Sequence, residues 1–164
     1  FKKKLDKKKI KDSKKLSKKK RNRLEIYIKK NSLWSIGSAS IKEIEKLNIL
    51  NASLLAMKRS IKKLKSKPTL VLIDGNKLPK ISGYNLKSVI KGDQKISEIS
   101  AASIIAKVAR DKFITKMSKD FTKYSWDKNA GYATSHHINA IKKFGITKHH
   151  RKTFAPIHNI LSLS

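Results

Sequence analysis

The feature that most restricts the fold of this chain is a continuous apolar run that ends at an aspartate and a glycine. The run is Thr69-Leu70-Val71-Leu72-Ile73, and Asp74-Gly75 follows it directly. An unbroken run of this kind is typical of a strand buried on both faces, as strands of α/β proteins are. Helical patterns lie on either side of the run. The sequence therefore predicts one α/β domain in which helices flank a sheet.

The remaining patterns predict mostly helices. Alternation over residues 33–38 indicates a half-buried strand, and a second short strand is expected at 86–90. Ser40 and Glu43 form a Ser-x-x-Glu capping box, which marks the start of a helix. Residues 147–157 look irregular and are rich in histidine and basic residues. Helices are predicted over about 17–30, 51–65, 96–124 and 135–144, with Gly145 ending the last.

The charge balance favours a polyanionic partner. The chain carries 41 Lys and Arg against 11 Asp and Glu, a formal net charge of +30. A positive field of that strength attracts nucleic acid. Residues 1–21 are mostly basic, and residues 1–11 resemble a disordered basic lead-in. Lysine enrichment by an A- and T-rich genome is the competing explanation, so the charge supports a nucleic-acid partner without identifying it.

Two absences in the sequence exclude whole classes of site. The chain has no cysteine, which excludes disulfides and thiolate metal sites and is compatible with a reducing cytosol. No apolar run approaches the roughly 18 residues of a transmembrane helix. We therefore expect a cytoplasmic protein with no membrane contact. The spacing of the five histidines matches no standard zinc motif.

Asp74 is the first candidate functional carboxylate. It follows the predicted buried strand at its carboxyl end, where ligand sites collect in α/β sheets. An Asp-Gly pair is also a common turn. Taken alone, Asp74 is as well explained by a turn as by a functional site.

Asp111 is the second candidate, and it is expected on a helix. Seven positions bring it to within roughly 20° of Ile104 on that helix, and Ala101 and Val108 lie nearby. Asp111 therefore borders the apolar stripe that should face the core, where a charge is costly unless it is paired or binds a metal. The alternative is an ion pair with Lys107, in the weaker order of lysine before aspartate.

Two such aspartates could hold a hard cation such as Mg²⁺ or Mn²⁺. Two of these ions about 4 Å apart can activate a water and stabilise the leaving oxygen of a phosphodiester. Such a site usually contains three or four carboxylates, so Asp93 is a third candidate, although a loop aspartate flanked by lysines is more often a surface residue. Tyr132, in a glycine loop before a helix, could stack on a sugar or base or pack in the core.

Several segments, in this order, resemble the bacterial type 2 ribonuclease H family, ribonuclease HII. Together they cover Asp12 to Ile157, and several elements in the right order are far more specific than any single motif. The segments that carry the resemblance are Asp12-Ser13-Lys14-Lys15-Leu16-Ser17, Asn48-Ile49-Leu50-Asn51-Ala52 with Leu55-Ala56-Met57, Leu72-Ile73-Asp74-Gly75, Lys91-Gly92-Asp93-Gln94-Lys95, Ala101-Ala102-Ser103-Ile104-Ile105-Ala106-Lys107-Val108 with Arg110-Asp111, Gly131-Tyr132-Ala133-Thr134, and His150-Arg151-Lys152-Thr153-Phe154 with Pro156-Ile157.

The resemblance implies a ribonuclease H-like fold, with a mixed sheet flanked by helices and a helical C-terminal part. It implies hydrolysis of the RNA strand of RNA–DNA hybrids with Mg²⁺ or Mn²⁺, including incision at single ribonucleotides in duplex DNA that leaves a 3′-hydroxyl and a 5′-phosphate. We expect a monomer whose partner is such a hybrid or ribonucleotide-containing DNA.

The resemblance also implies roles for individual residues. By position, Asp74 and Asp111 match metal-binding, catalytic carboxylates, and Asp111 ranks above Asp93 because of its place on the helix. Tyr132 matches the tyrosine that senses the junction between ribonucleotide and deoxyribonucleotide. Weaker candidates for phosphate contacts are Lys14, Lys15 and Arg151.

One element of the family pattern does not occur in this sequence. Family members open with a strand bearing an Asp-Glu pair and a Gly-Arg-Gly turn, and neither is present. We therefore expect residues 1–164 to form a single ribonuclease H-like domain that lacks its N-terminal strand or strands. Such a polypeptide should be poorly stable and inactive, while its full-length parent is active. The alternatives are a degenerate paralogue and a non-catalytic basic RNA-binding protein.

Overall fold

The computed structural model describes Asp6, Ile10 and residues 16–162 of the chain. Contacts divide the chain into two compact units. The first comprises Phe1–Ala39 and Ala52–Val108, and the second comprises Ser40–Asn51 and Ala109–Ser164. Each unit has its own hydrophobic cluster. That the whole chain is one domain stays a prediction.

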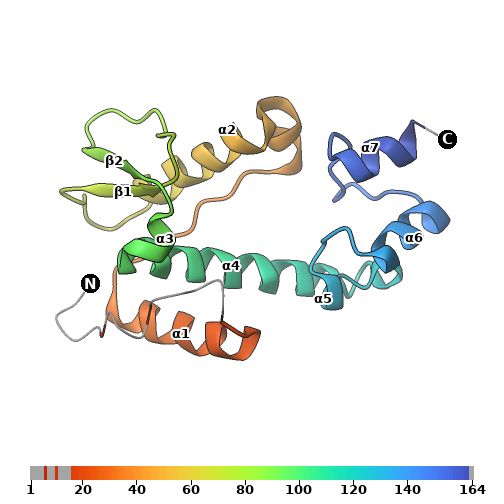
Figure 1. Cartoon of the computed structure of the whole chain (residues 1–164), viewed down its shortest axis with the longest axis horizontal. Helices are drawn as coiled ribbons and strands as arrows, with labels where there is room; N and C mark the ends of the chain where they lie inside the picture. The colour runs from red at the N-terminus through yellow and green to blue at the C-terminus, as the bar shows by residue number, and fades with distance from the viewer. Residues whose placement is uncertain (1–5, 7–9, 11–15, 163–164) are drawn as a thin grey trace. The chain divides into compact units, whose positions relative to one another are not determined.

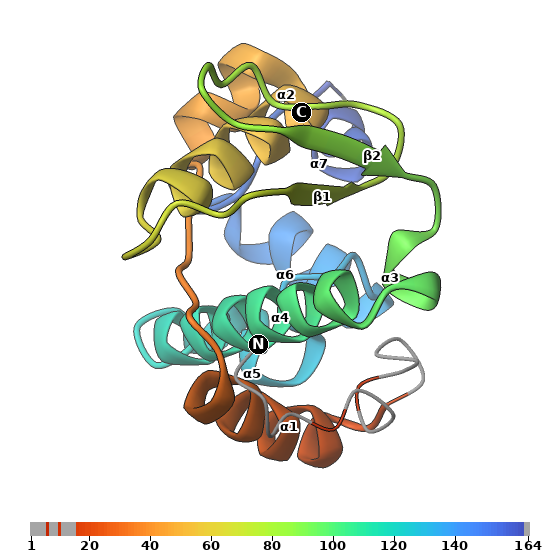
Figure 2. The ribbon, with the colours of Figure 1, turned by 90° about the vertical axis from the view of Figure 1, so that its left-hand side faces the viewer.

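The first unit contains the sheet. Strand β1 (Val71–Asp74) pairs in parallel with β2 (Leu86–Val89), in a register that sets Asp74 opposite Val89. Figures 1 and 2 show the two strands side by side. The strands expected at 69–73 and at 86–90 are both present. Burial of β1 on both faces was a wrong expectation, because only Ile73 is fully buried. The described part of the sheet is two strands wide, and so narrow a sheet leaves side chains of each strand in contact with solvent.

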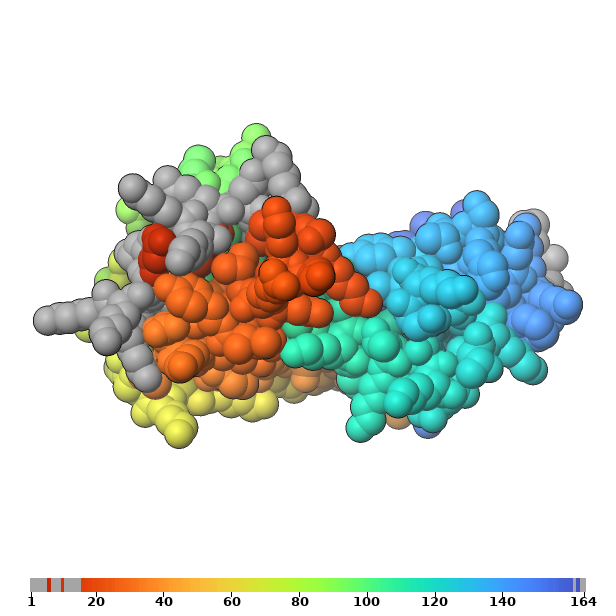
Figure 3. Space-filling model, turned by 90° about the horizontal axis from the view of Figure 1, so that it is seen from below, coloured from red at the N-terminus to blue at the C-terminus, as the bar shows by residue number. Residues whose placement is uncertain are grey.

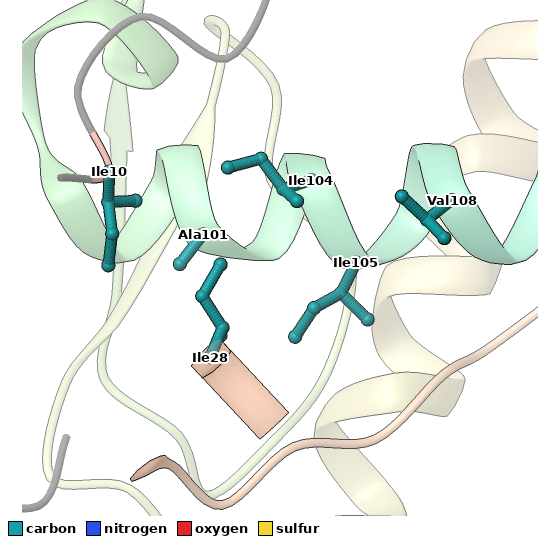
Figure 4. Close-up of a cluster of buried hydrophobic side chains, with 6 residues drawn as sticks. All are labelled: Ile10, Ile28, Ala101, Ile104, Ile105 and Val108. Atoms are coloured by element: carbon teal, nitrogen blue, oxygen red, sulfur yellow. The ribbon is translucent and has the colours of Figure 1, made fainter. Parts of the chain in front are cut away.

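Two helices enclose the core of the first unit. They are α1 (Lys18–Asn31) and the first part of α4 (Ser97–Met117). The buried side chains of this core, gathered along α4 in Figure 4, are Ile10, Ile28, Ala101, Ile104, Ile105 and Val108. The predicted apolar stripe of α4 is thereby confirmed. Each large aliphatic side chain contributes about 1.5–3 kcal/mol when fully buried, so this cluster holds α4 against α1.

The outer face of α1 is basic. Ser17 caps the helix by accepting a hydrogen bond from the Lys20 backbone N–H. Figure 3 shows α1, in orange, at the surface of the molecule. The exposed basic residues of this face are Lys18, Lys19, Lys20, Arg23 and Lys30. We call these five residues the basic face of α1.

Residues 33–38 form an extended connection and not the predicted strand. Their backbone groups bond to side chains of α2 (Ile41–Lys62) in place of another strand: Arg59 Nη1 donates to the Ser38 carbonyl at 2.8 Å. Gly37 lies so close to α2 that a Cβ there would be 2.0 Å from the Ala56 carbonyl oxygen. The alternating pattern reflects packing against a helix, which sequence alternation cannot distinguish from packing in a sheet.

Helix α2 combines two predicted helices across a kink. The Ser40–Glu43 capping box is confirmed, because the Glu43 N–H donates to Ser40 Oγ and Glu43 Oε2 accepts from the Ser40 N–H. The kink is at Asn48, whose φ of 64° and ψ of 168° are not helical. Its side chain accepts a hydrogen bond from the Asn51 N–H at 3.1 Å and so caps the second half.

The second unit is helical, as expected for the C-terminal part. After α4 come η3 (Thr122–Tyr124), α5 (Trp126–Asn129), α6 (Ser135–Phe144) and α7 (Ala155–Leu161). Its buried core consists of Tyr124, Trp126, Ala140, Ile141 and Ile157. The bounds of α6 agree with the prediction, whereas α4 ends earlier than expected. Residues 147–157 were expected to be irregular, yet their end forms the start of α7. Among the described residues, no helix is long and apolar enough to cross a bilayer.

Candidate active site

The carboxyl end of β1 meets the turn that leads into α3 (Gly92–Lys95). Asp74 is the last residue of β1, and its Oδ1 accepts a hydrogen bond of 2.8 Å from the backbone N–H of Gly92. The next residue, Gly75, donates its N–H to the Val89 carbonyl at 3.0 Å. Asp74 is thus an exposed carboxylate whose direction is fixed by a backbone donor. We call Asp74, Gly92 and Asp93 the β1–α3 corner.

Gly92 allows the backbone to approach this closely. A Cβ at this position would lie 2.5 Å from Ile99 Cδ1, 3.3 Å from Val89 Cβ and 3.5 Å from Asp74 Oδ1. The preceding residue, Lys91, has a left-handed backbone with φ 54°. The Lys-Gly-Asp sequence therefore makes a tight entry to α3 that directs one amide at Asp74.

Asp93 follows this amide directly and is buried. Its residue surface is 3% exposed, and α3 packs against β1. Burying a carboxylate is costly unless hydrogen bonds, an opposite charge or a cation compensate. The structure therefore places Asp93 in the same corner as Asp74 and away from solvent, whereas a lysine-flanked loop aspartate was expected at the surface.

The β1–α3 corner offers carboxylate oxygens, which are donors that a hard cation can bind. Carboxylate oxygens are the ligands that Mg²⁺ and Mn²⁺ prefer. In the part of the chain that the structure describes, no group of three or more His, Cys, Asp or Glu side chains could hold a metal ion. Asp74 and Asp93 therefore supply a suitable pair of donors, but not a complete protein ligand set.

The second unit brings Asp111 and Tyr132 together through Arg110. Arg110 Nη1 lies 3.6 Å from Asp111 Oδ1, and its guanidinium carbon lies 5.0 Å from the centre of the Tyr132 ring. The Asp111 side chain is 14% exposed, and Tyr132 is 56% exposed. Tyr132 is thus a surface ring and not a core residue. Sequence reasoning missed the role of Arg110, because its ring contact is 22 positions away.

The other predicted site residues have separate outcomes. The predicted pairing of Asp74 with Asp111 stays a prediction, since the two belong to different units. Arg151 places its guanidinium carbon 4.6 Å from the centre of the Phe154 ring. Lys14 and Lys15 lie outside the described residues.

A buried group of aromatic and histidine rings contacts the backbone of the Tyr132 loop, and no sequence pattern indicated it. His137 Nδ1 is 2.9 Å from the Tyr132 carbonyl oxygen, and His137 Nε2 accepts a hydrogen bond of 2.9 Å from Trp126 Nε1. The same His137 Nε2 is 3.1 Å from Nε2 of His150. Tyr124 packs on both imidazoles with ring centres 6.2 and 5.0 Å away. The His spacing excluded zinc motifs but could not reveal these contacts.

The environment of His150 opposes its protonation. Burial, and to a lesser extent the neighbouring His137 and His149, lower the pKa of His150 to about 4, against an opposing effect of the Thr147 backbone. The Thr147 N–H donates to His150 Nδ1 at 2.9 Å, which occupies the nitrogen's lone pair. His150 is therefore a neutral, buried imidazole at physiological pH.

This chain is similar to members of the ribonuclease HII family. The profile of the ribonuclease HII family matches residues 1–158. Ribonuclease HII of Pelagibacter ubique is 70% identical over 157 residues, which cover 96% of this chain and 84% of that protein. Ribonuclease HII of Ehrlichia chaffeensis is 49% identical over 156 residues, which cover 94% of this chain and 73% of that protein.

Two solved structures share the fold. Ribonuclease H2 from Pyrococcus horikoshii superposes with a TM-score of 0.77 and 21% identity, covering 94% of this chain and 81% of that one. RNase HII from Archaeoglobus fulgidus, solved in a complex with PCNA, superposes with a TM-score of 0.68 and 24% identity, covering 88% of this chain and 78% of that one. The ribonuclease H-like α/β fold is thereby confirmed. With the family match over nearly its whole length, the chain belongs to the ribonuclease HII family of type 2 ribonuclease H endonucleases.

Proposed function

We propose that this protein hydrolyses the RNA strand of RNA–DNA hybrids and incises duplex DNA at single ribonucleotides. The products are a 3′-hydroxyl and a 5′-phosphate, and the reaction uses Mg²⁺ or Mn²⁺. Membership of the ribonuclease HII family supports the ribonuclease H activity. The observation that carries the proposal to particular residues is the β1–α3 corner, where a backbone amide orients the Asp74 carboxylate and the residue after that amide, Asp93, is buried.

Asp74 and Asp93 would together hold a cation that supplies Lewis-acid chemistry, which activates water and neutralises charge on the phosphodiester. The chain's own contribution is to orient Asp74 through the Gly92 amide and to keep Asp93 out of solvent. We therefore rank Asp93 above Asp111, the reverse of the order that helix position alone favours, because Asp111 already pairs with Arg110.

Tyr132 would contact the sugar at the junction between ribonucleotide and deoxyribonucleotide. Its ring is exposed, and Arg110 covers one side of it, which limits how the ring can turn. An exposed aromatic face that is held in place suits stacking on a sugar or base. The basic face of α1, together with Lys14, Lys15 and Arg151, would contact phosphates along the duplex.

The test is a set of single substitutions in the complete gene product that contains residues 1–164. Asp74→Asn and Asp93→Asn should each lower the cleavage rate by more than about a hundredfold, since even changes next to metal ligands cost 10–100-fold. Asp111→Asn should lower the cleavage rate by less than about tenfold, because Asp111 is not one of the proposed metal ligands. Exposed Asp127→Asn is the matched control and should cleave at the wild-type rate. The substrates are an RNA–DNA hybrid and duplex DNA with one ribonucleotide, and EDTA should stop cleavage until Mg²⁺ is added back.

Two results would contradict this assignment. Wild-type rates in both the Asp74 and Asp93 variants would move the metal site away from the corner. Tight binding of the hybrid with no cleavage at any Mg²⁺ or Mn²⁺ concentration would favour a non-catalytic nucleic-acid-binding protein.

We further propose that the polypeptide of residues 1–164 alone cleaves little. The sequence offers no Asp-Glu pair, and the corner supplies two carboxylates where such a site usually contains three or four. Assayed beside the complete gene product at equal concentration, the 164-residue polypeptide should therefore show only background cleavage. Ordinary turnover with Mg²⁺ would contradict this.

A further inference from the structure

The ring group behind Tyr132 forms a continuous chain of hydrogen bonds within the second unit. The chain runs from the Tyr132 carbonyl to His137, from His137 to His150, and from His150 to the Thr147 backbone. Trp126 adds a side branch by donating to His137 Nε2. His137 and His150 are 4% and 5% exposed, so water contributes little to these contacts.

The hydrogen-bond partners of each imidazole nitrogen show which nitrogen of His137 and of His150 carries the proton. The Thr147 N–H can only donate, so His150 Nδ1 accepts and the His150 proton is on Nε2. The Tyr132 carbonyl can only accept, so the His137 proton is on Nδ1 and its Nε2 accepts from Trp126 and His150. Trp126 Nε1 and His150 Nε2 therefore share the single lone pair of His137 Nε2.

The series of hydrogen bonds ends at the loop that carries Tyr132, and the backbone of this loop is strained. Ala130 and Gly131 both have positive φ, 49° and 73°. The Tyr132 N–H donates to the Asn129 carbonyl, and its own carbonyl accepts from Thr134 as well as from His137. His137 is thus the side chain that ties the Tyr132 carbonyl to the buried core. A positive φ outside glycine, as at Ala130, is strained and persists when surrounding contacts hold it.

We propose that His137, backed by Trp126 and His150, is a positioning residue that sets the exposed ring of Tyr132 for ribonucleotide recognition. The inference rests on the proposed function, in which Tyr132 contacts the sugar at the junction. His137 does not touch the substrate. It acts through the Tyr132 backbone, while Arg110 restrains the same ring from its face.

Two amides of different length separate positioning from simple core packing. His137→Asn puts an N–H near the position of Nδ1, which keeps the bond to Tyr132 but loses the one to Trp126. His137→Gln reaches the position of Nε2, which keeps the bond to Trp126 but loses the one to Tyr132. His149→Asn is the matched control, because the His149 ring packs on Trp126 and Phe121 but does not bond to Tyr132.

The measurement is kcat/KM on duplex DNA with one ribonucleotide, in the complete gene product, with and without Tyr132→Ala. His137→Gln should lower kcat/KM about tenfold when Tyr132 is present and less than about twofold in the Tyr132→Ala background, because coupled residues are non-additive. The kcat/KM of His137→Asn should stay within about threefold of the wild-type value. His149→Asn should lower the melting temperature, and its effect on kcat/KM should not depend on Tyr132. Should His137→Gln not fold, Trp126→Phe removes the donor to His137 and should show the same dependence on Tyr132 at smaller size.

The failures are distinguishable. An equal loss from His137→Gln in both backgrounds, or a larger loss from Asn than from Gln, means that His137 only stabilises the core, and the inference is overturned while the proposed function stands. Absence of ribonucleotide-directed cleavage by the wild-type gene product would overturn the proposed function and the inference together.

Discussion

At the scale of single residues, Gly92 links backbone geometry to the candidate chemistry. Its amide holds Asp74 Oδ1 at 2.8 Å, and its missing side chain leaves room for Ile99 and Val89. The adjacent Asp93 is buried through the same tight turn. One glycine therefore sets the direction of one carboxylate and the burial of the other.

Gly92→Ala should disturb the metal site more than it disturbs folding. Ile99 Cδ1, 2.5 Å from the new Cβ, can rotate away, but Val89 Cβ at 3.3 Å belongs to a strand, so we expect the turn to shift and carry its amide away from Asp74. We expect cleavage to fall by about 10–100-fold, as is typical for a group that orients a metal ligand. Mg²⁺ titration of cleavage measures the effect. Gln94→Ala, at an exposed position of α3, is the control. An unchanged Mg²⁺ requirement in Gly92→Ala would contradict the role of the amide.

His150 makes the second residue-scale prediction, which concerns acid stability. Its pKa is lowered to about 4 in the folded protein from 6.5, mainly by burial. Between those values the unfolded chain binds the proton and the folded one does not, so the unfolding free energy should decrease as pH falls from 6.5 towards 4. One pKa unit corresponds to about 1.4 kcal/mol, so the shift sets an upper bound of roughly 3.5 kcal/mol on this loss.

Urea unfolding at pH 7 and at pH 4.5 measures this loss. His150→Asn keeps an acceptor for the Thr147 N–H but cannot titrate, so its unfolding free energy should change less between the two pH values. His158→Asn, at an exposed position, should behave like wild type. If His150→Asn and wild type lose equal free energy, protonation of His150 does not weaken the fold.

At the scale of elements, the sequence was most informative where local chemistry decides the structure. The capping box at Ser40, the end of α6 at Gly145 and the apolar stripe of α4 all follow from residues within one or two turns. The predicted strand at 33–38 failed, because its partner is a helix brought alongside by tertiary packing.

The residues of the candidate site also divide into those that local sequence predicts and those that depend on tertiary packing. Asp74 was predictable, because its place at a strand end is a local feature. The Gly92–Asp74 bond spans 18 positions and the His137–His150 contact spans 13, so no local pattern could reveal them. The same holds for Asp93, whose burial depends on where α3 packs and not on its lysine neighbours.

Asn48 provides the element-scale prediction. It has a φ of 64° with an extended ψ, and it caps the second half of α2 through the Asn51 N–H. Asn48→Ala removes the cap and keeps the strained backbone, so the unfolding free energy should fall by about 1–2 kcal/mol. Asn48→Gly also removes the cap but relieves the strain, and should cost less. Thermal unfolding measures both, with exposed Lys46→Ala as control. An Asn48→Gly variant less stable than Asn48→Ala would contradict the strain argument.

At the scale of the whole molecule, charge determines how the protein meets its substrate. A net charge of +30 draws any polyanion, whereas the recognition of ribonucleotides must come from a few residues such as Tyr132. Phosphate contacts add affinity without discriminating between sequences or sugars. The lysine excess therefore contributes affinity and the selective site contributes discrimination. Added salt should weaken the affinity that the lysines contribute and leave the discrimination unchanged.

Binding of an RNA–DNA hybrid by the Asp74→Asn variant, which should not cleave, separates the two contributions. The dissociation constant should rise steeply between 50 and 200 mM salt, by about 10³–10⁵-fold if six to ten phosphates are contacted. Replacing Lys18, Lys19 and Lys20 with Gln should lower the slope of log Kd against log salt by up to about three, because each lost phosphate contact removes about one. Tyr132→Ala should leave that slope unchanged while reducing the preference for ribonucleotide-containing DNA over all-DNA duplex. An unchanged slope in the lysine variant would exclude the basic face of α1 from the contact surface and place the electrostatic attraction elsewhere on the chain.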